Sequence, residues 1–316
     1  MNLDLNKYMK YHIDIEFFYK QNDFLLESAR HINNISKWTN TVYEKIYNEL
    51  SMHNKIKNDV ILLKDDFDVD VFFDECIIEL NANVETNTNS NTCSVTGEYL
   101  LSSGYDENKK YTVKILLNIL GSLPSSSKTY SLFNSEVKST LAHELAHAYV
   151  DYNQNRTISA EDKKIEDNID TQYLVYTGFT SNNMYIRDLV SCIYFSMKSE
   201  VHAMQNEISI QIMNLRNGVR DSKTANEIIQ KTGVYQRLIL YEEKLNKLKF
   251  VDDIIKEELL QEYNKIFNTN INDYAKMISK LNVRMIYARN KIIDAAANYI
   301  QVAYTFRNAI NYNEMK

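Results

Sequence analysis

Helix-breaking residues are scarce in this sequence, which contains one proline and six glycines among its 316 residues. Proline and glycine are the residues that most often end or weaken a helix, so few positions along the chain interrupt one. We therefore expect long helices over much of the sequence. The composition, with 44% hydrophobic and 25% charged residues, is typical of a soluble globular protein rather than a disordered chain.

The spacing of apolar residues changes from helical to strand-like and back along the chain. Apolar residues recur at three- and four-residue steps over about 4–56, which predicts helix. Strand patterns follow between about 59 and 120, in FDVDVFF, CIIEL, SVTGEYLLSS and KKYTVKILLNIL. Later segments show only helical spacing, over about 184–215, 224–248, 251–267 and 271–308. The order predicts an α+β protein that is mostly α, with one small, mainly antiparallel sheet and long helices before and after it.

This change of pattern predicts three parts of the chain. Residues 1–57 form an N-terminal helical segment, residues 58–216 a central core with the strands, and residues 217–316 a C-terminal helical region. A polar stretch of mixed pattern over 153–183 lies inside the core, with one short helix expected around 159–170 and a loop over 178–183.

Charge and hydropathy exclude several classes of partner. The net charge of −6 gives no electrostatic reason to expect nucleic acid. Asp4, Asp14 and Glu16 stand where a signal peptide needs an apolar run. The most apolar later stretch, 113–123, is too short to span a bilayer. We therefore expect a cytoplasmic protein that does not bind a membrane.

The three cysteines, Cys76, Cys93 and Cys192, are an odd number and are widely spaced. They form no CxxC pair, so they predict neither a disulfide framework nor a cysteine zinc site. We interpret them as buried thiols in a reducing interior.

A helix that contains the sequence HELAH (143–147) follows the predicted strands. Asn134 and Ser135 are typical N-cap residues, so we expect this helix to begin there and to continue to about Tyr152. Two of the six histidines of the chain fall within these five residues.

The spacing of this motif suits a metal. His143 and His147 stand at i and i+4, which places both side chains on one face of a helix about one turn apart. Glu144 is rotated from His143 by about 100°, so it lies outside the ligand set but within reach of a bound water. The motif therefore predicts a zinc site with Glu144 as a general base.

AHELAHAYV, preceded by the strand YTVKILLNIL, resembles the zincin metallopeptidases over about residues 94–215. The resemblance implies Zn²⁺ as cofactor, a peptide or protein as substrate, and hydrolysis of peptide bonds by a zinc-activated water. In zincins an edge strand beside the active helix holds an extended peptide by β-augmentation. Here that strand would be 111–120 or its partner in the sheet.

A catalytic zinc needs a third protein ligand. Metzincins take a histidine six residues after the second one, beyond a glycine, but this position is Asn153 and no glycine lies between. Gluzincins take a glutamate from a later helix, and Glu200 fits best because a lone carboxylate among apolar residues is costly unless it is paired or binds a metal. Its helical neighbours are Ile193, Met197, Met204 and Ile208. We therefore predict His143, His147 and Glu200 as ligands.

The sequence leaves two alternative third ligands, and it does not identify the residues that support the site. Asp151 follows His147 by one turn, and His202 is a good donor but faces away from Glu200. Position 204 is Met, where gluzincins place an aspartate, so the groups that orient the histidines are not identified. The candidates for stabilising an oxyanion are Tyr149, Arg156, Tyr173, Tyr176 and His202.

Two functions are compatible with the sequence. The intact Glu144 favours a peptidase, because a purely structural zinc site has no use for a general base. The long helices also suit assembly surfaces, as in a phage virion or connector component built on a peptidase fold, with zinc as a structural staple. An oligomer or assembly partner would then bind through the terminal helices, and a phage-encoded protein could reside in the virion. The absence of a signal sequence disfavours a secreted protease toxin.

Overall fold

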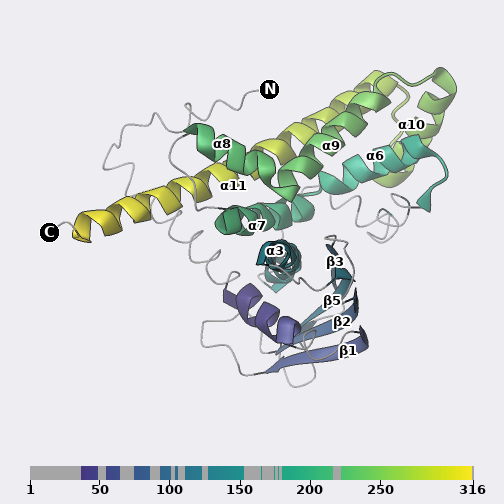
Figure 1. The fold of residues 1–316 in the computed structure, drawn as a ribbon. Helices are drawn as coiled ribbons and strands as arrows, with labels where there is room; N and C mark the ends of the chain where they lie inside the picture. The colour runs from purple at the N-terminus through teal and green to yellow at the C-terminus, as the bar shows by residue number, and fades with distance from the viewer. Residues whose placement is uncertain are drawn as a thin grey trace. The chain divides into compact units, whose positions relative to one another are not determined.

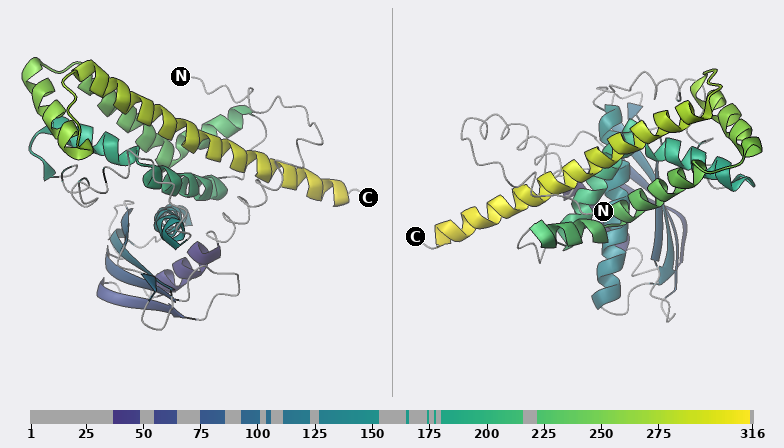
Figure 2. Two further views of the ribbon diagram at one scale, coloured as in Figure 1. Left: turned by 180° about the vertical axis from the view of Figure 1, so that it is seen from behind. Right: turned by 90° about the horizontal axis from the view of Figure 1, so that it is seen from above.

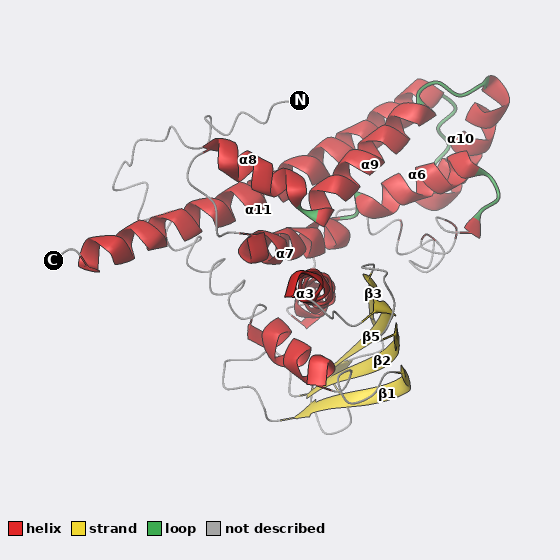
Figure 3. Cartoon of the chain, viewed as in Figure 1, coloured by secondary structure: helices red, strands yellow, loops and turns green. Residues whose placement is uncertain are grey.

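A computed structural model of the chain describes residues 37–48, 55–64, 75–85, 93–100, 104–105, 111–122, 127–152, 180–215 and 222–314, and the single positions 165, 174 and 177. Helices predominate among them (Figure 3), which confirms the predicted α+β, mostly α class. Within these residues, no helix has the length and apolarity required to cross a membrane.

The chain folds into two compact units that each combine distant segments. The first unit contains Met1–Asn155, Ser209–Ile228 and Ala297–Lys316, and the second contains Arg156–Ile208 and Ile229–Ala296. Helix α7 (Lys198–Leu215) begins in the second unit and ends in the first, so it belongs to both.

The first unit contains a mixed sheet (Figure 1). The strand order is β1-β2-β5-β3, and β4 also pairs with β5. The β2–β5 pairing is parallel and the other pairings are antiparallel, whereas the sequence predicted a mainly antiparallel sheet. The short distances along the sequence between successive strands suggest hairpins. They do not show that β5 lies between β2 and β3 in the sheet. The strands are β1 (Lys55–Lys64), β2 (Glu75–Glu85), β3 (Cys93–Tyr99), β4 (Gly104–Tyr105) and β5 (Tyr111–Ser122).

Alternating residues of β2 and β5 form the core of this unit. Every second residue is buried over 76–82 of β2 and 113–119 of β5, while Glu79 and Asn81 on the other face of β2 are exposed. This period of two is what a half-buried sheet requires. The buried residues are Cys76, Ile78, Leu80, Val113, Ile115, Leu117 and Ile119. The expected strand FDVDVFF (67–73) lies outside the described residues.

Helix α3 (Ser127–Tyr152) carries HELAH and packs against β3 (Figure 1). Its apolar side is completely buried through Val137, Leu141, Leu145 and Ala148. The helix begins before the predicted caps Asn134 and Ser135, which therefore lie inside it. Serine and asparagine favour helix starts but do not forbid helix interior, so a local cap signal did not locate the true beginning.

A short helix over residues 37–48 confirms part of the helical spacing predicted for 4–56; residues 1–36 lie outside the described part. Trp38, Val42, Tyr43 and Ile46 are buried. The Lys138 ammonium of α3 lies 4.7 Å from the centroid of the Tyr43 ring, a cation–π contact between the two helices.

The second unit is helical. It contains α6 (Met184–Phe195), α9 (Gly233–Leu248), α10 (Asp253–Phe267) and the first part of α11 (Tyr274–Glu314). Figure 2 shows α9 and this part of α11 running alongside each other. They are antiparallel, because the Tyr274 hydroxyl donates to the carbonyl of Leu248 at 2.6 Å while Arg289 pairs with Glu242 at 3.0 Å.

The helix predicted over 184–215 is two helices, α6 and α7, separated at Ser196 and Met197. The Ser196 hydroxyl donates to the carbonyl of Ile193 at 2.9 Å, which closes the end of α6. Arg284 of α11 donates from Nε to the Ser196 hydroxyl at 3.2 Å and from Nη2 to the Ser196 carbonyl at 3.4 Å. Because of this break, Glu200 lies in the first turn of α7 and not in the middle of one long helix.

Two of the three cysteines are buried free thiols, as predicted. Burial raises the pKa of Cys76 and that of Cys192 to about 12, so both are protonated at neutral pH. The side chain of Cys93 lies outside the described residues.

Replacement of Arg284 by methionine tests the break between α6 and α7. The Arg284→Met variant keeps apolar packing but loses both hydrogen bonds to Ser196, so we expect the free energy of unfolding to fall by about 1–3 kcal/mol. Chemical denaturation measures this change. Lys276→Met, at an exposed position of the same helix, is the control. Equal stabilities of the two variants would contradict the role assigned to Arg284.

Candidate metal centre

The side chains of His143 and His147 meet on one face of α3. Their Nε2 atoms are 3.2 Å apart, and the ring centroids are 4.9 Å apart with an angle of 73° between the ring planes. Both side chains are half-buried. At this distance one ring can donate an N–H to the other.

That separation agrees with the geometry of zinc. Two nitrogens that each lie 2.0–2.1 Å from one tetrahedral Zn²⁺ are about 3.3 Å apart. The separation of the Nε2 atoms of His143 and His147 is therefore close to the one that a shared tetrahedral ion requires. The i, i+4 spacing of the two histidines brings their Nε2 atoms together because α3 is a continuous helix through the motif.

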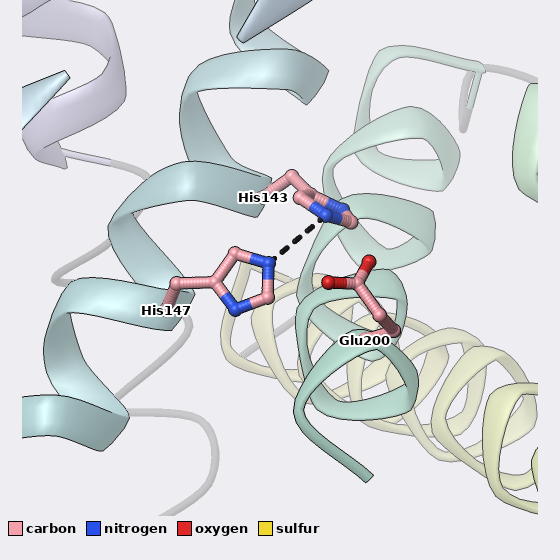
Figure 4. A group of neighbouring side chains, drawn as sticks. All are labelled: His143, His147 and Glu200. Carbon is pink, nitrogen blue, oxygen red and sulfur yellow. Dashed lines mark hydrogen bonds between the residues drawn. The ribbon is translucent and has the colours of Figure 1, made fainter. Parts of the chain in front are cut away.

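Glu200 completes a group of three possible ligands. His143, His147 and Glu200 each offer one ligand atom, these atoms lie within 4.8 Å of one another, and the group could hold a metal ion. Figure 4 shows the two rings and the carboxylate pointing toward one another. Two histidines and one carboxylate are a donor set found in catalytic zinc sites. The types of ligand atom present therefore suit a metal ion.

The surroundings of Glu200 are those expected for a buried ligand. Its exposed fraction is 7%, and its helical neighbours Met197, Met204 and Ile208 are buried. Ile193, which was predicted to share its helix, belongs to α6 instead. The position in the first turn of α7 also stabilises a negative charge, because the N-terminus of a helix carries partial positive charge.

Arg237 and Tyr241 of α9 also interact electrostatically with Glu200. Burial alone would lower the pKa of Arg237, but its ion pair with Glu207 raises the pKa above its ordinary value, with smaller contributions from Tyr241 and Glu200. Burial raises the pKa of the Tyr241 phenol, Arg237 opposes this, and Cys192 and Glu200 add to it. Tyr241 therefore stays protonated and Arg237 charged at neutral pH.

Glu144 is buried and is held by the sheet. Its exposed fraction is 7%, and its Oε2 atom accepts a hydrogen bond of 2.8 Å from the backbone N–H of Tyr99 in β3. Gly97 lies against the same side chain. The residue proposed as the base is thus joined to the strand at the end of the sheet order.

Other residues singled out in the sequence lie elsewhere or are not described. His202 does not belong to the group of possible ligands, and burial lowers its pKa. Asp151 lies in α3, but its side chain is outside the described residues. Tyr149 is half-buried. Arg156, Tyr173, Tyr176 and most of the polar stretch 153–183 lie outside the described part.

Sequence reasoning missed Gly97 and Tyr99 beside Glu144, and Arg237 and Tyr241 beside Glu200. Arg237 and Tyr241 stand at i and i+4, which places them on one face of α9, but nothing local indicates what that face contacts. Tyr99 acts through its backbone, so its side-chain identity carries no signal.

The chain shows no similarity that identifies a family. No family model matches it, and no curated protein or solved structure gives a significant match.

Metal analysis of the purified protein tests the three ligands. We expect about one zinc ion per chain, because catalytic sites bind zinc through three protein ligands. His143→Ala, His147→Ala and Glu200→Ala should each lower the affinity by more than the roughly 10- to 100-fold that loss of an outer hydrogen-bond partner costs. His202→Ala and Asp151→Ala serve as controls and should bind zinc normally. Full zinc affinity in Glu200→Ala would show that the third ligand is another residue.

Proposed function

We propose that the protein is a zinc-dependent metallopeptidase with Glu144 as its general base. The observation that carries this proposal is the group formed by His143, His147 and Glu200, with Glu144 directly adjacent to a ligand on the same helix. This arrangement supports the zincin-like, gluzincin-type site that the sequence resembles.

His143 and His147 would hold the zinc through nitrogen, and Glu200 would hold it through oxygen. When bound in such a site, zinc lowers the pKa of a coordinated water and polarises the carbonyl of a substrate. The side chains of both histidines are half-buried.

Glu144 would take the proton of the attacking water and pass it to the leaving amine. An ionised carboxylate offers about four lone-pair positions, and the Tyr99 N–H uses one of them. The burial of Glu144 also limits the number of orientations that its carboxylate can adopt.

β3 offers an edge to which an extended peptide could add. β5 pairs with β2 on one side and with β3 on the other, whereas in the described part of the chain no strand pairs with the second edge of β3. The Leu100 N–H donates to the Lys114 carbonyl of β5 at 2.9 Å. In an antiparallel pair, the backbone N–H and C=O groups of successive residues point alternately toward the partner strand and away from it. Because Leu100 points toward β5, Val95 and Gly97 direct their N–H and C=O groups to the other edge of β3. Of the two strands considered for substrate binding, β3 thus fits the role.

The bond between Tyr99 and Glu144 also favours a second candidate function. Glu144 joins α3 to β3, so its presence has a structural reason that is independent of catalysis. A protein that uses zinc as a staple within an assembly could keep Glu144 for this reason. The decisive variant must therefore remove the base and leave the hydrogen bond intact.

Glu144→Gln meets this requirement, because the glutamine amide oxygen can still accept the Tyr99 N–H. We expect the variant to keep the zinc content and the thermal stability of the wild type. Cleavage of a broad peptide library should fall roughly 10²- to 10⁴-fold, since the general base is lost. The rate of cleavage and the Tm of both proteins test this prediction.

His143→Ala is the matched control, because it removes a ligand and leaves Glu144 in place. A peptidase should lose both zinc and cleavage in this variant. If the wild type cleaves no peptide while His143→Ala unfolds or fails to assemble, zinc is a structural staple and the peptidase proposal is wrong.

A further inference from the structure

Strand β3 contacts the Glu144 side chain at two positions, Gly97 and Tyr99. The Tyr99 N–H donates to Oε2 of Glu144 at 2.8 Å. The register of β3 and β5 directs this N–H away from β5, toward the edge of the sheet. The carboxylate thus reaches over the face of β3 to its edge.

Gly97 leaves no room for a side chain. A Cβ atom at this position would lie 2.8 Å from Cγ and 2.9 Å from Oε1 of Glu144, and 2.8 Å from Cγ2 of Thr140. All three separations are shorter than the roughly 3.5–4.0 Å at which carbon atoms pack favourably. The Gly97 backbone does not have the positive φ that would otherwise require glycine. Space for Glu144 and Thr140 is therefore the reason for glycine here.

Neither neighbour can move aside easily. Glu144 is buried, and the close contact involves its Cγ atom as well as the end of the side chain. Thr140 precedes Glu144 by one turn of α3, so the two side chains lie next to each other on the helix face toward β3. Any side chain at position 97 would have to displace the carboxylate or separate α3 from β3.

We propose that Gly97 is a positioning residue that, together with the Tyr99 amide, fixes the carboxylate of Glu144. The amide sets the position of Oε2, and the Cα of Gly97 sets the closest approach of Cγ and Oε1 to the strand. A base is effective only if it is held in hydrogen-bonding reach of the proton that it takes. This inference rests on the proposed peptidase function for its catalytic consequence, but the contact itself is independent of activity.

The test begins with Gly97→Ala in a Thr140→Ser background, which removes Cγ2 and leaves Glu144 as the remaining close neighbour. We expect a lower urea midpoint of unfolding than for Thr140→Ser alone. In the same Thr140→Ser background, Glu144→Ala removes both Cγ and the carboxylate, so adding Gly97→Ala to that double variant should lower the midpoint little or not at all. Thr96→Ala, at an exposed position of the same strand, controls for the effect of alanine in β3.

The catalytic consequence is measured on the same proteins. Gly97→Ala with Thr140→Ser should keep its zinc content and KM while kcat falls, by up to about 100-fold if the carboxylate is displaced by about 1 Å. A merely structural role would not lower kcat selectively. Hydrogen exchange at the Tyr99 amide should be slow in wild type and in Glu144→Gln, and faster in Glu144→Ala.

Each outcome decides the proposal. If Gly97→Ala lowers the midpoint equally with and without the Glu144 side chain, or if both combinations fail to fold, Gly97 does not act through Glu144 and the proposal is wrong. An unchanged kcat in an active protein would also overturn it. If the unfolding midpoints are coupled but the wild type cleaves no peptide, Gly97 does position Glu144 and the peptidase function is what fails.

Discussion

The hydrogen bond from the Tyr99 amide to Glu144 connects the two features on which the candidate site depends: a helix with two histidines and the edge of a sheet. α3 supplies the two histidines and buries its apolar side completely. β3 supplies a main-chain donor and, at Gly97, the space that the glutamate needs. A helix that was rotated or shifted along its axis would lose this bond and bring Cγ into collision with the strand.

The carboxylate of Glu200 presents a different physical problem, because burial of a charge is unfavourable unless other charges compensate. The first turn of α7 and the Arg237 guanidinium both supply positive potential. Arg284 contributes indirectly, because it binds Ser196 at the break between α6 and α7. α7 begins two residues after Ser196, which places Glu200 in its first turn. A divalent ion would add the largest positive charge to this set.

The parts that could be predicted from the sequence are those that depend on neighbours within one or two helical turns. The pairing of His143 with His147 follows from their i, i+4 spacing, and the burial of Glu200 follows from its apolar neighbours. Arg284 contacts the end of α6 at Ser196, 88 residues away, and no local pattern reveals that contact. The bond of Glu144 spans 45 residues and uses a backbone donor, so it is equally invisible to residue spacing.

The arrangement of the sheet shows the same limit. Alternation correctly indicates the buried faces of β2 and β5, but it does not reveal that these two strands are parallel neighbours. The alternation of apolar and polar side chains along a strand depends on which face of the sheet is buried. Which strands are neighbours depends instead on contacts between segments that are distant in sequence. The resemblance to zincins and the division of the chain at about residues 57 and 216 stay predictions.

The capture of one edge amide by a carboxylate also bears on self-association. An exposed strand edge is a template on which a second copy of a chain can add, and natural sheets commonly protect their edges with charge. Glu144 occupies the Tyr99 donor at the end of β3. Strand addition is thereby restricted to the short stretch around Val95 and Gly97, which is long enough to hold a peptide but short for a stable contact between two sheets. The same glutamate would thus discourage association of two copies through the edge of β3.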